Sequence, residues 1–143
     1  MSMNKSELPF LSATVLSKLL AAKEVSPVEA TEAYLERIQS LDSTIRAFVT
    51  VTAETALVSA KQSEQEIVNG DHRGPMHGIP VAVKDQIYTN GVLTTGGSSV
   101  FSDFVPAFDA TVVDNLRKSG AVMLGKLNTV SYTHTTLPTH DSA

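Results

Sequence analysis

The sequence predicts an α/β fold in which helices flank a mixed β-sheet. Segments with an apolar face at helical spacing alternate with short apolar, β-branched runs, which is typical of sheets packed against helices. Each predicted helix also begins or ends at a recognisable signal, such as the Ser-Pro pair at residues 26–27 or Gly70. We find no internal repeat, and 143 residues suffice for one domain.

The first two predicted helices begin at serines. Ser12 can cap a helix whose leucines at positions 16, 19 and 20 share one face. Ser26 precedes a proline at the first helical position and is followed three residues later by Glu29, the pattern of a capping box. We expect this second helix to run to about Leu41 and to be broken by Asp42 and the serine after it.

Strands and helices then alternate. The β-branched run 45–51 predicts a strand, residues 53–69 predict a helix stopped by Gly70, and the apolar run 78–85 predicts a buried strand. Residues 86–108 have no helical period and read as an irregular excursion, with an Asn-Gly pair that allows a hairpin. Asp109 is expected to cap a helix over residues 110–119, and residues 121–124 to form a short buried strand.

Composition limits the function. Hydrophobic residues make up 42% and charged residues 18%, the net charge is −4, and no basic block suggests nucleic-acid binding. The chain has no cysteine, which excludes disulfides and thiol catalysis. The four histidines lack metal-ligand spacing, so solvated histidines are the default and no cofactor is predicted. The polar N-terminus and the lack of a membrane-spanning run favour a cytoplasmic protein without a membrane signal.

Lys84 is the candidate catalytic residue. It stands with Asp85 at the end of the apolar run GIPVAVKD, and a buried strand can deliver a terminal charge to a cleft. Lysine becomes a useful base when burial or neighbouring charges lower its pKa. Most lysines at strand ends are simply solvated, and that interpretation stays open on the residues alone.

Lys126 completes a segment, residues 120–126, with the glycine and lysine spacing of a phosphate-binding loop. We reject that interpretation because the residues between the two glycines predict a strand and Leu127 replaces the required Ser or Thr. The glycine- and serine-rich residues 96–99 could donate backbone N–H groups to an anion, but more often form a turn.

Residues 74–128 resemble the amidase signature family over several ordered pieces. Residues 74–85 are similar to its catalytic-lysine strand and residues 94–98 to the Thr- and Gly-containing turn that follows. The segments 109–113 and 125–128, with Leu116 between them, are similar to its next helix, strand and loop. The helices before residue 74 resemble the family's N-terminal region less specifically.

This resemblance implies hydrolysis of a small-molecule amide, or transfer of its ammonia, by a Ser–cis-Ser–Lys triad. One serine attacks the amide carbonyl, the second relays the proton, and the lysine acts first as base and then as acid. The resemblance assigns the lysine role to Lys84 and a structural or orienting role to Asp85. It also implies that the fold is the N-terminal part of one amidase domain and is incomplete here.

Both catalytic serines of the family are expected beyond Asn128, where this chain has no Gly/Ser-rich stretch. We therefore assign residues 1–129 to the amidase domain and residues 130–143 to a non-homologous tail. The start of that tail matches the translation of a transposon-end sequencing adapter, so we interpret it as an artefact. The fragment as written is expected to be inactive and to expose sheet edges and apolar faces.

Three functions remain open from the sequence. The first is a stand-alone amidase acting on small non-peptide carboxamides. The second is the glutamine-hydrolysing component of the glutamyl-tRNA(Gln)/aspartyl-tRNA(Asn) amidotransferase, which would imply partner subunits. The third, of a different class, is a non-catalytic binding or structural module in which Lys84 is merely solvated.

Overall fold

The computed structural model describes residues 4–129. Its elements follow in the order η1 (Lys5–Phe10), α1 (Ala13–Ala21), α2 (Pro27–Ile45), β1 (Phe48–Val51), α3 (Ala53–Asn69), β2 (Pro80–Lys84), η2 (Ser99–Phe101), α4 (Thr111–Lys118) and β3 (Val122–Leu127). The predicted alternation of helices and strands is therefore present.

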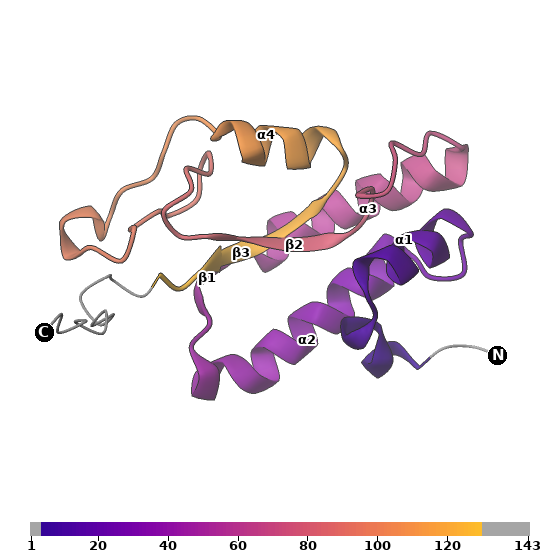
Figure 1. The fold of residues 1–143 in the computed structure, drawn as a ribbon, viewed down its shortest axis with the longest axis horizontal. Coiled ribbons are helices and arrows are strands. Elements are labelled where there is room, and N and C mark those ends of the chain that lie inside the picture. The colour runs from indigo at the N-terminus through magenta and orange to yellow at the C-terminus, as the bar shows by residue number, and fades with distance from the viewer. Residues whose placement is uncertain (1–3, 130–143) are drawn as a thin grey trace, which may run out of the picture.

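A mixed three-stranded sheet separates two layers of helices (Figure 1). β3 lies in the centre, pairing antiparallel with β1 and parallel with β2. α4 covers one face of the sheet, whereas α2 and α3 cover the other. The structure confirms the predicted fold class, a mixed sheet flanked by helices. Among residues 4–129 the outer edges of β1 and β2 have no partner strand.

Alternating side chains of β3 build the core on both sides of the sheet. Val122 and Leu124 pack with Ala56 and Ala60 of α3. Met123 points the other way and packs in a second cluster with Val83 of β2 and Val113 of α4. A strand that is apolar on both faces is typical of the middle of a sheet covered by helices on both sides.

The helix-start signals operate as predicted. The Ser12 hydroxyl accepts a hydrogen bond from the Val15 N–H, at 3.3 Å. At α2 the Ser26 hydroxyl accepts from the Glu29 N–H at 3.1 Å, while the Glu29 carboxylate accepts from the Ser26 N–H at 2.9 Å. This reciprocal capping box satisfies two N–H groups that a helix start leaves unpaired. α3 ends at Gly70, which has φ of 94°.

Two predicted boundaries around α2 and α4 were wrong. α2 continues past Leu41 to Ile45, because the Asp42 carboxylate accepts from the N–H groups of Ala47 and Phe48 beyond the helix end. Asp109 is not the cap of α4. Its carboxylate instead accepts from the Asn90 N–H and pairs with Arg117, so the helix begins later, at Thr111.

Two further expectations also differ from the structure. β3 extends to Leu127 rather than ending at residue 124, because its hydrogen bonds to β1 and β2 continue through the segment expected to be a loop. Residues 86–108 form no hairpin and contain only the short helix η2. Turn-forming residues alone did not produce a strand pair there, since the flanking segments lack alternating apolar residues.

Gly125 marks the closest approach of two strands. A Cβ atom at this position would lie 2.1 Å from the Thr50 carbonyl oxygen of β1, and Gly125 has φ of 152°. The pairing of β3 with β2 also shifts register next to this residue, where Met123 and Gly125 face consecutive residues of β2. Glycine is therefore required here for β1 to pair with the central strand.

The capping box gives a direct test of the α2 start. Replacing Ser26 by Ala should lower the free energy of unfolding by about 1 kcal/mol, since the Glu29 N–H loses its acceptor. The matched control is Ser40→Ala in the same helix, where the hydroxyl only returns to the Arg37 carbonyl. Urea unfolding followed by circular dichroism compares the two variants. Equal stabilities would contradict the role given to the capping box.

Candidate functional site

Lys84 is the last residue of β2 and its side chain is exposed. Val83, the residue before it, is buried in the cluster with α4. Successive strand residues point to opposite faces, so Lys84 lies on the face turned toward α2, and Asp85 lies on the face turned toward α4. The strand end thus presents an amine on one side and a carboxylate on the other.

Asp85 is completely buried and ties the strand end to a later turn. Its Oδ2 atom accepts from the Thr95 N–H at 3.0 Å and also from the Thr95 hydroxyl. Its own N–H donates to the Leu127 carbonyl at 2.9 Å, which continues the pairing of β2 with β3. Asp85 therefore ties the end of β2 to the turn at Thr95 and to β3.

Lys126, in β3, is the other buried charge of this region, with 0% of its surface exposed. Its ammonium donates to the Ile87 carbonyl at 2.6 Å, to the Thr94 hydroxyl at 2.7 Å and more weakly to the Asp85 carbonyl at 3.5 Å. The Asp85 Oδ1 atom lies 4.0 Å from the ammonium. Burial lowers the pKa of Lys126, and the nearby Asp85 charge partly offsets that effect.

The turn beside these residues contains Gly96 and Gly97, both with positive φ. The Thr95 hydroxyl, which donates to Asp85, accepts from the Gly97 N–H at 3.2 Å. A hollow of about 120 Å³ adjoins the turn. Its lining consists of Gln86, Thr94, Thr95, Gly96 and three aromatic residues, Tyr88, Phe101 and Phe104. The carboxyl end of β2 is therefore surrounded by both polar and aromatic groups.

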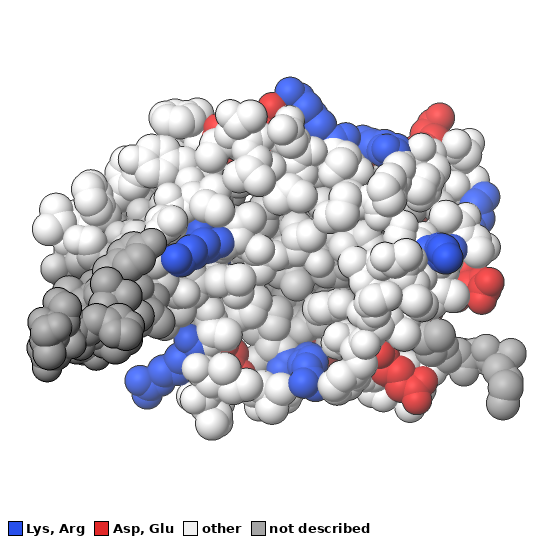
Figure 2. All heavy atoms as spheres, in the orientation of Figure 1, with Lys and Arg blue, Asp and Glu red and all other residues white. Residues whose placement is uncertain are grey.

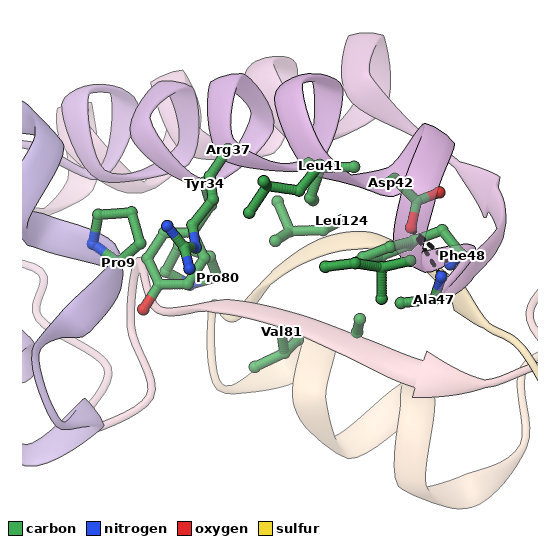
Figure 3. Close-up of a pocket in the computed structure, with 13 residues that line it drawn as sticks. Pro9, Tyr34, Arg37, Leu41, Asp42, Ala47, Phe48, Pro80, Val81 and Leu124 are labelled. Carbon is green, nitrogen blue, oxygen red and sulfur yellow. Dashed lines mark hydrogen bonds between the residues drawn. The ribbon is translucent and has the colours of Figure 1, made fainter.

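A larger hollow of about 330 Å³ lies between α2 and the sheet (Figure 3). Its lining is mainly apolar, and Lys84 is not part of it. The two charged residues in its wall already have partners: Asp42 accepts from two backbone N–H groups, and the Arg37 guanidinium lies 4.4 Å from the centre of the Phe10 ring. This hollow therefore offers packing surface rather than reactive groups.

His77 was expected to be solvated but is completely buried. Its Nδ1 atom accepts from the Arg73 N–H at 3.0 Å, so the neutral ring carries its proton on Nε2, 3.0 Å from Glu66 Oε2. Burial lowers the pKa of His77, although the Glu66 carboxylate opposes the shift. A Cβ on Gly120 would lie 2.3 Å from the ring, which shows how tightly the imidazole is enclosed.

Sequence reasoning placed Lys84 correctly at a strand end but missed Lys126 as a buried group. One signal was available: Lys126 interrupts an otherwise apolar run that continues to Leu127. The buried position of His77 had no comparable signal, since its neighbours in sequence form a turn. Among residues 4–129, no group of three or more His, Cys, Asp or Glu side chains is arranged to hold a metal ion.

Comparison with known proteins identifies the family. The family model described as Amidase matches residues 29–136, three quarters of the chain. The chain belongs to the amidase family. The resemblance found on the residues around Lys84 is thereby confirmed. The match continues past residue 129, and the assignment of residues 130–143 as an artefact, outside the described residues, stays a prediction.

Relatives of this amidase-family chain include enzymes of two kinds. It is 48% identical over 122 residues to the A subunit of the glutamyl-tRNA(Gln) amidotransferase of Moorella thermoacetica, covering 85% of this chain and 25% of that protein. It is 41% identical over 117 residues to the putative amidase AmiD of Mycobacterium tuberculosis, covering 82% and 25%. The chain thus spans about a quarter of the length of these curated relatives.

Solved structures agree with the family assignment. The native peptide amidase from Stenotrophomonas maltophilia superposes with a TM-score of 0.79 at 37% identity, covering 85% of this chain and 26% of that one. An amidase family protein from Bacillus anthracis gives a TM-score of 0.77 at 31% identity, over 87% and 25%. The described fold is therefore a part of the larger amidase fold.

The buried histidine predicts acid sensitivity. The folded state lowers the pKa of His77 below its ordinary value of 6.5, so the unfolded chain binds a proton that the folded chain does not. Stability from His77 is complete above pH 6.5 and is lost as the pH falls from there toward the lowered pKa. Urea unfolding between about pH 8 and pH 5 should show this loss.

The comparison variant for that experiment is at the exposed His72, whose ring lies 5.6 Å from that of His77 and whose charge adds to the lowering of the His77 pKa. His72→Gln should keep most of the pH dependence, because burial is the largest cause of the lowered His77 pKa, whereas His77→Gln should flatten it while lowering stability overall. A pH dependence that survives in His77→Gln would show that another group is responsible.

Proposed function

We propose that the complete protein hydrolyses the carbon–nitrogen bond of a small non-peptide carboxamide, with Lys84 as its general base. The observation that supports this most directly is the position of Lys84, exposed at the carboxyl end of a buried strand, in a chain that belongs to the amidase family. The substrate is a small-molecule amide, and the reaction needs no cofactor.

In the proposed reaction, a serine oxygen attacks the amide carbonyl and its proton passes through a second serine to the Lys84 amine. The carbon–nitrogen bond then breaks, the leaving nitrogen takes a proton back, and ammonia departs from an acyl-enzyme. Water then attacks the ester carbonyl and its proton passes to the Lys84 amine. The ester bond breaks, the first serine oxygen takes a proton back through the second serine, and the carboxylic acid is released. Both serines lie in the part of the family domain that this chain does not include.

Lys84 can accept a proton only when its amine is neutral, and burial is one effect that favours the neutral form of a lysine. In the described residues its side chain is exposed. We therefore propose that the remainder of the complete protein covers Lys84 and supplies the serines. The 143-residue chain by itself is then inactive, as the sequence predicts.

The face seen in Figure 2 carries no concentrated patch of one charge. Figure 2 shows one face, on which Lys, Arg, Asp and Glu side chains are spread around the rim while the middle is uncharged. None of the helices within residues 4–129 combines the length and the apolar composition needed to cross a membrane. Neither observation competes with a small amide as the substrate.

The second candidate is the glutamine-hydrolysing component of a tRNA-dependent amidotransferase. The observation in its favour is the 48% identity to the A subunit of the glutamyl-tRNA(Gln) amidotransferase. In this case the amide is the side chain of glutamine, the released ammonia passes to a charged tRNA, and partner subunits accompany the protein. The chemistry at Lys84 is the same for both candidates.

Substitution of Lys84 tests the proposed base. In the complete protein, Lys84→Met keeps the aliphatic stem but removes the amine, so kcat for carboxamide hydrolysis should fall by about 10²- to 10⁴-fold. The unfolding midpoint of this variant is measured alongside kcat, to show that the complete protein still folds. Lys61→Met, at another exposed lysine, should leave both quantities unchanged. Activity retained in Lys84→Met would refute the assignment.

Ammonia release separates the two candidates. The purified complete protein would be offered acetamide, propionamide, benzamide and glutamine, first alone and then with the partner subunits encoded in the same genome. A stand-alone amidase should release ammonia from at least one simple carboxamide without partners. Release from glutamine alone, and only with the partners present, would instead establish the amidotransferase component.

A further inference from the structure

The buried ammonium of Lys126 connects the end of β2 to a turn inside the irregular excursion that follows, residues 86–108. Two of its acceptors, the Asp85 and Ile87 carbonyls, belong to the residues that directly follow Lys84. The third acceptor, the Thr94 hydroxyl, belongs to the turn that returns to the same place. One charge in the central strand therefore holds the start of the excursion and the turn at Thr94 within it.

Asp85 closes this arrangement from the opposite side. Its carboxylate accepts from the Thr95 N–H and hydroxyl, while its Oδ1 atom faces the Lys126 ammonium at 4.0 Å. Lys126, Asp85, Thr94 and Thr95 thus form a ring of contacts, which we call the Lys126 clamp. Every side chain in it except that of Thr95 belongs to a residue that is completely or almost completely buried.

The clamp lies behind Lys84 rather than beside it. In the pairing of β2 with β3, Lys126 is opposite Val83, and Leu127 is opposite Lys84. Paired residues of neighbouring strands share a face, and adjacent residues of one strand do not. Lys126 therefore points toward the α4 side and Lys84 toward the α2 side, so Lys126 cannot touch a group that approaches Lys84.

We propose that Lys126 is a positioning residue, which fixes the direction of Lys84 by holding the backbone directly after it. This inference rests on the proposed function, in which Lys84 is the base. A proton-transfer group must be held within a fraction of an ångström of its productive position. β2 has no partner strand on its outer edge within residues 4–129, so its end is restrained by the pairing with β3, which continues to the Asp85 N–H, and by the clamp.

A purely structural role for Lys126 makes a different prediction. Burying an ion pair costs desolvation energy, and apolar replacements of such pairs are often neutral for stability. In the positioning role, Lys126 stands in an otherwise apolar strand because of the geometry that it imposes and not because of the stability that it adds. If Lys126 positions Lys84, its replacement lowers kcat while the fold and substrate binding stay the same. If its role is purely structural, kcat falls only when the fold is lost.

The experiment uses the complete protein and the carboxamide that its wild-type form hydrolyses fastest. Thr94→Val removes one acceptor of the clamp without changing side-chain volume, and Lys126→Met removes the ammonium. Each should lower kcat, by about 10- to 100-fold for Lys126→Met in line with supporting residues in other enzymes, while KM stays unchanged. Hydrogen exchange of the Thr95 N–H should become faster in both variants, because its neighbour Thr94 loses the contact to Lys126 in each of them.

Two further variants serve as controls. Thr94→Ser keeps the hydroxyl but lacks the methyl group, and it should have the kcat of the wild type. A low kcat in Thr94→Ser would mean that the methyl group, not the hydroxyl, is required. Thr31→Val makes the same substitution at another fully buried threonine, in α2 and outside the clamp, and should leave kcat and the exchange rate unchanged.

The outcomes separate this inference from the function on which it rests. Wild-type kcat in both Lys126→Met and Thr94→Val, with Lys84→Met inactive, would overturn the positioning role and leave the base assignment standing. Activity in Lys84→Met would remove the proposed function and the positioning role together. If Lys126→Met does not fold, the comparison of Thr94→Val with Thr94→Ser decides alone.

Discussion

The pairing of β3 with both of its neighbours is the constraint on which the rest of the structure depends. β3 is hydrogen-bonded on both edges, and its side chains enter the core on both faces. The strand also supplies Gly125, which admits β1, and Lys126, which holds the segment after β2. The last strand of the described chain therefore organises elements that lie far before it in the sequence, so the fold rests on long-range contacts.

The region of Lys84 shows how a sheet separates two tasks at one place. On one face is an exposed amine, and on the other is a buried network of charges and hydroxyl groups. Buried charges are tolerated only when hydrogen bonds compensate for lost water, and the Lys126 ammonium meets that condition through carbonyl and hydroxyl oxygens. Burying these charges costs desolvation energy that an apolar core at the same place would not require.

Much of the fold could be predicted from the sequence because its signals are local. The capping box at Ser26 and the glycine at the end of α3 act on neighbouring residues, and both predictions are confirmed. The errors involve groups whose partners are distant in sequence. The Asp109 carboxylate binds the Asn90 N–H and the Arg117 side chain. The burial of His77 depends on its contacts with Glu66 and Gly120. Of the candidate site, the position of Lys84 was predictable because an apolar run ended there, whereas the clamp behind it required tertiary pairing to be known.

The alternation of faces along β2 makes this site sensitive to strand parity. A slip of one residue between β2 and β3 would turn Lys84 toward the interior and carry Asp85 out to solvent. The amine would then be buried without a carboxylate partner, and Lys126 would lose its nearest negative charge. Single-residue insertions or deletions between Pro80 and Asp85 should therefore damage the site far more than substitutions there. They exchange the two faces of the sheet for every side chain that follows, whereas a substitution changes only one side chain.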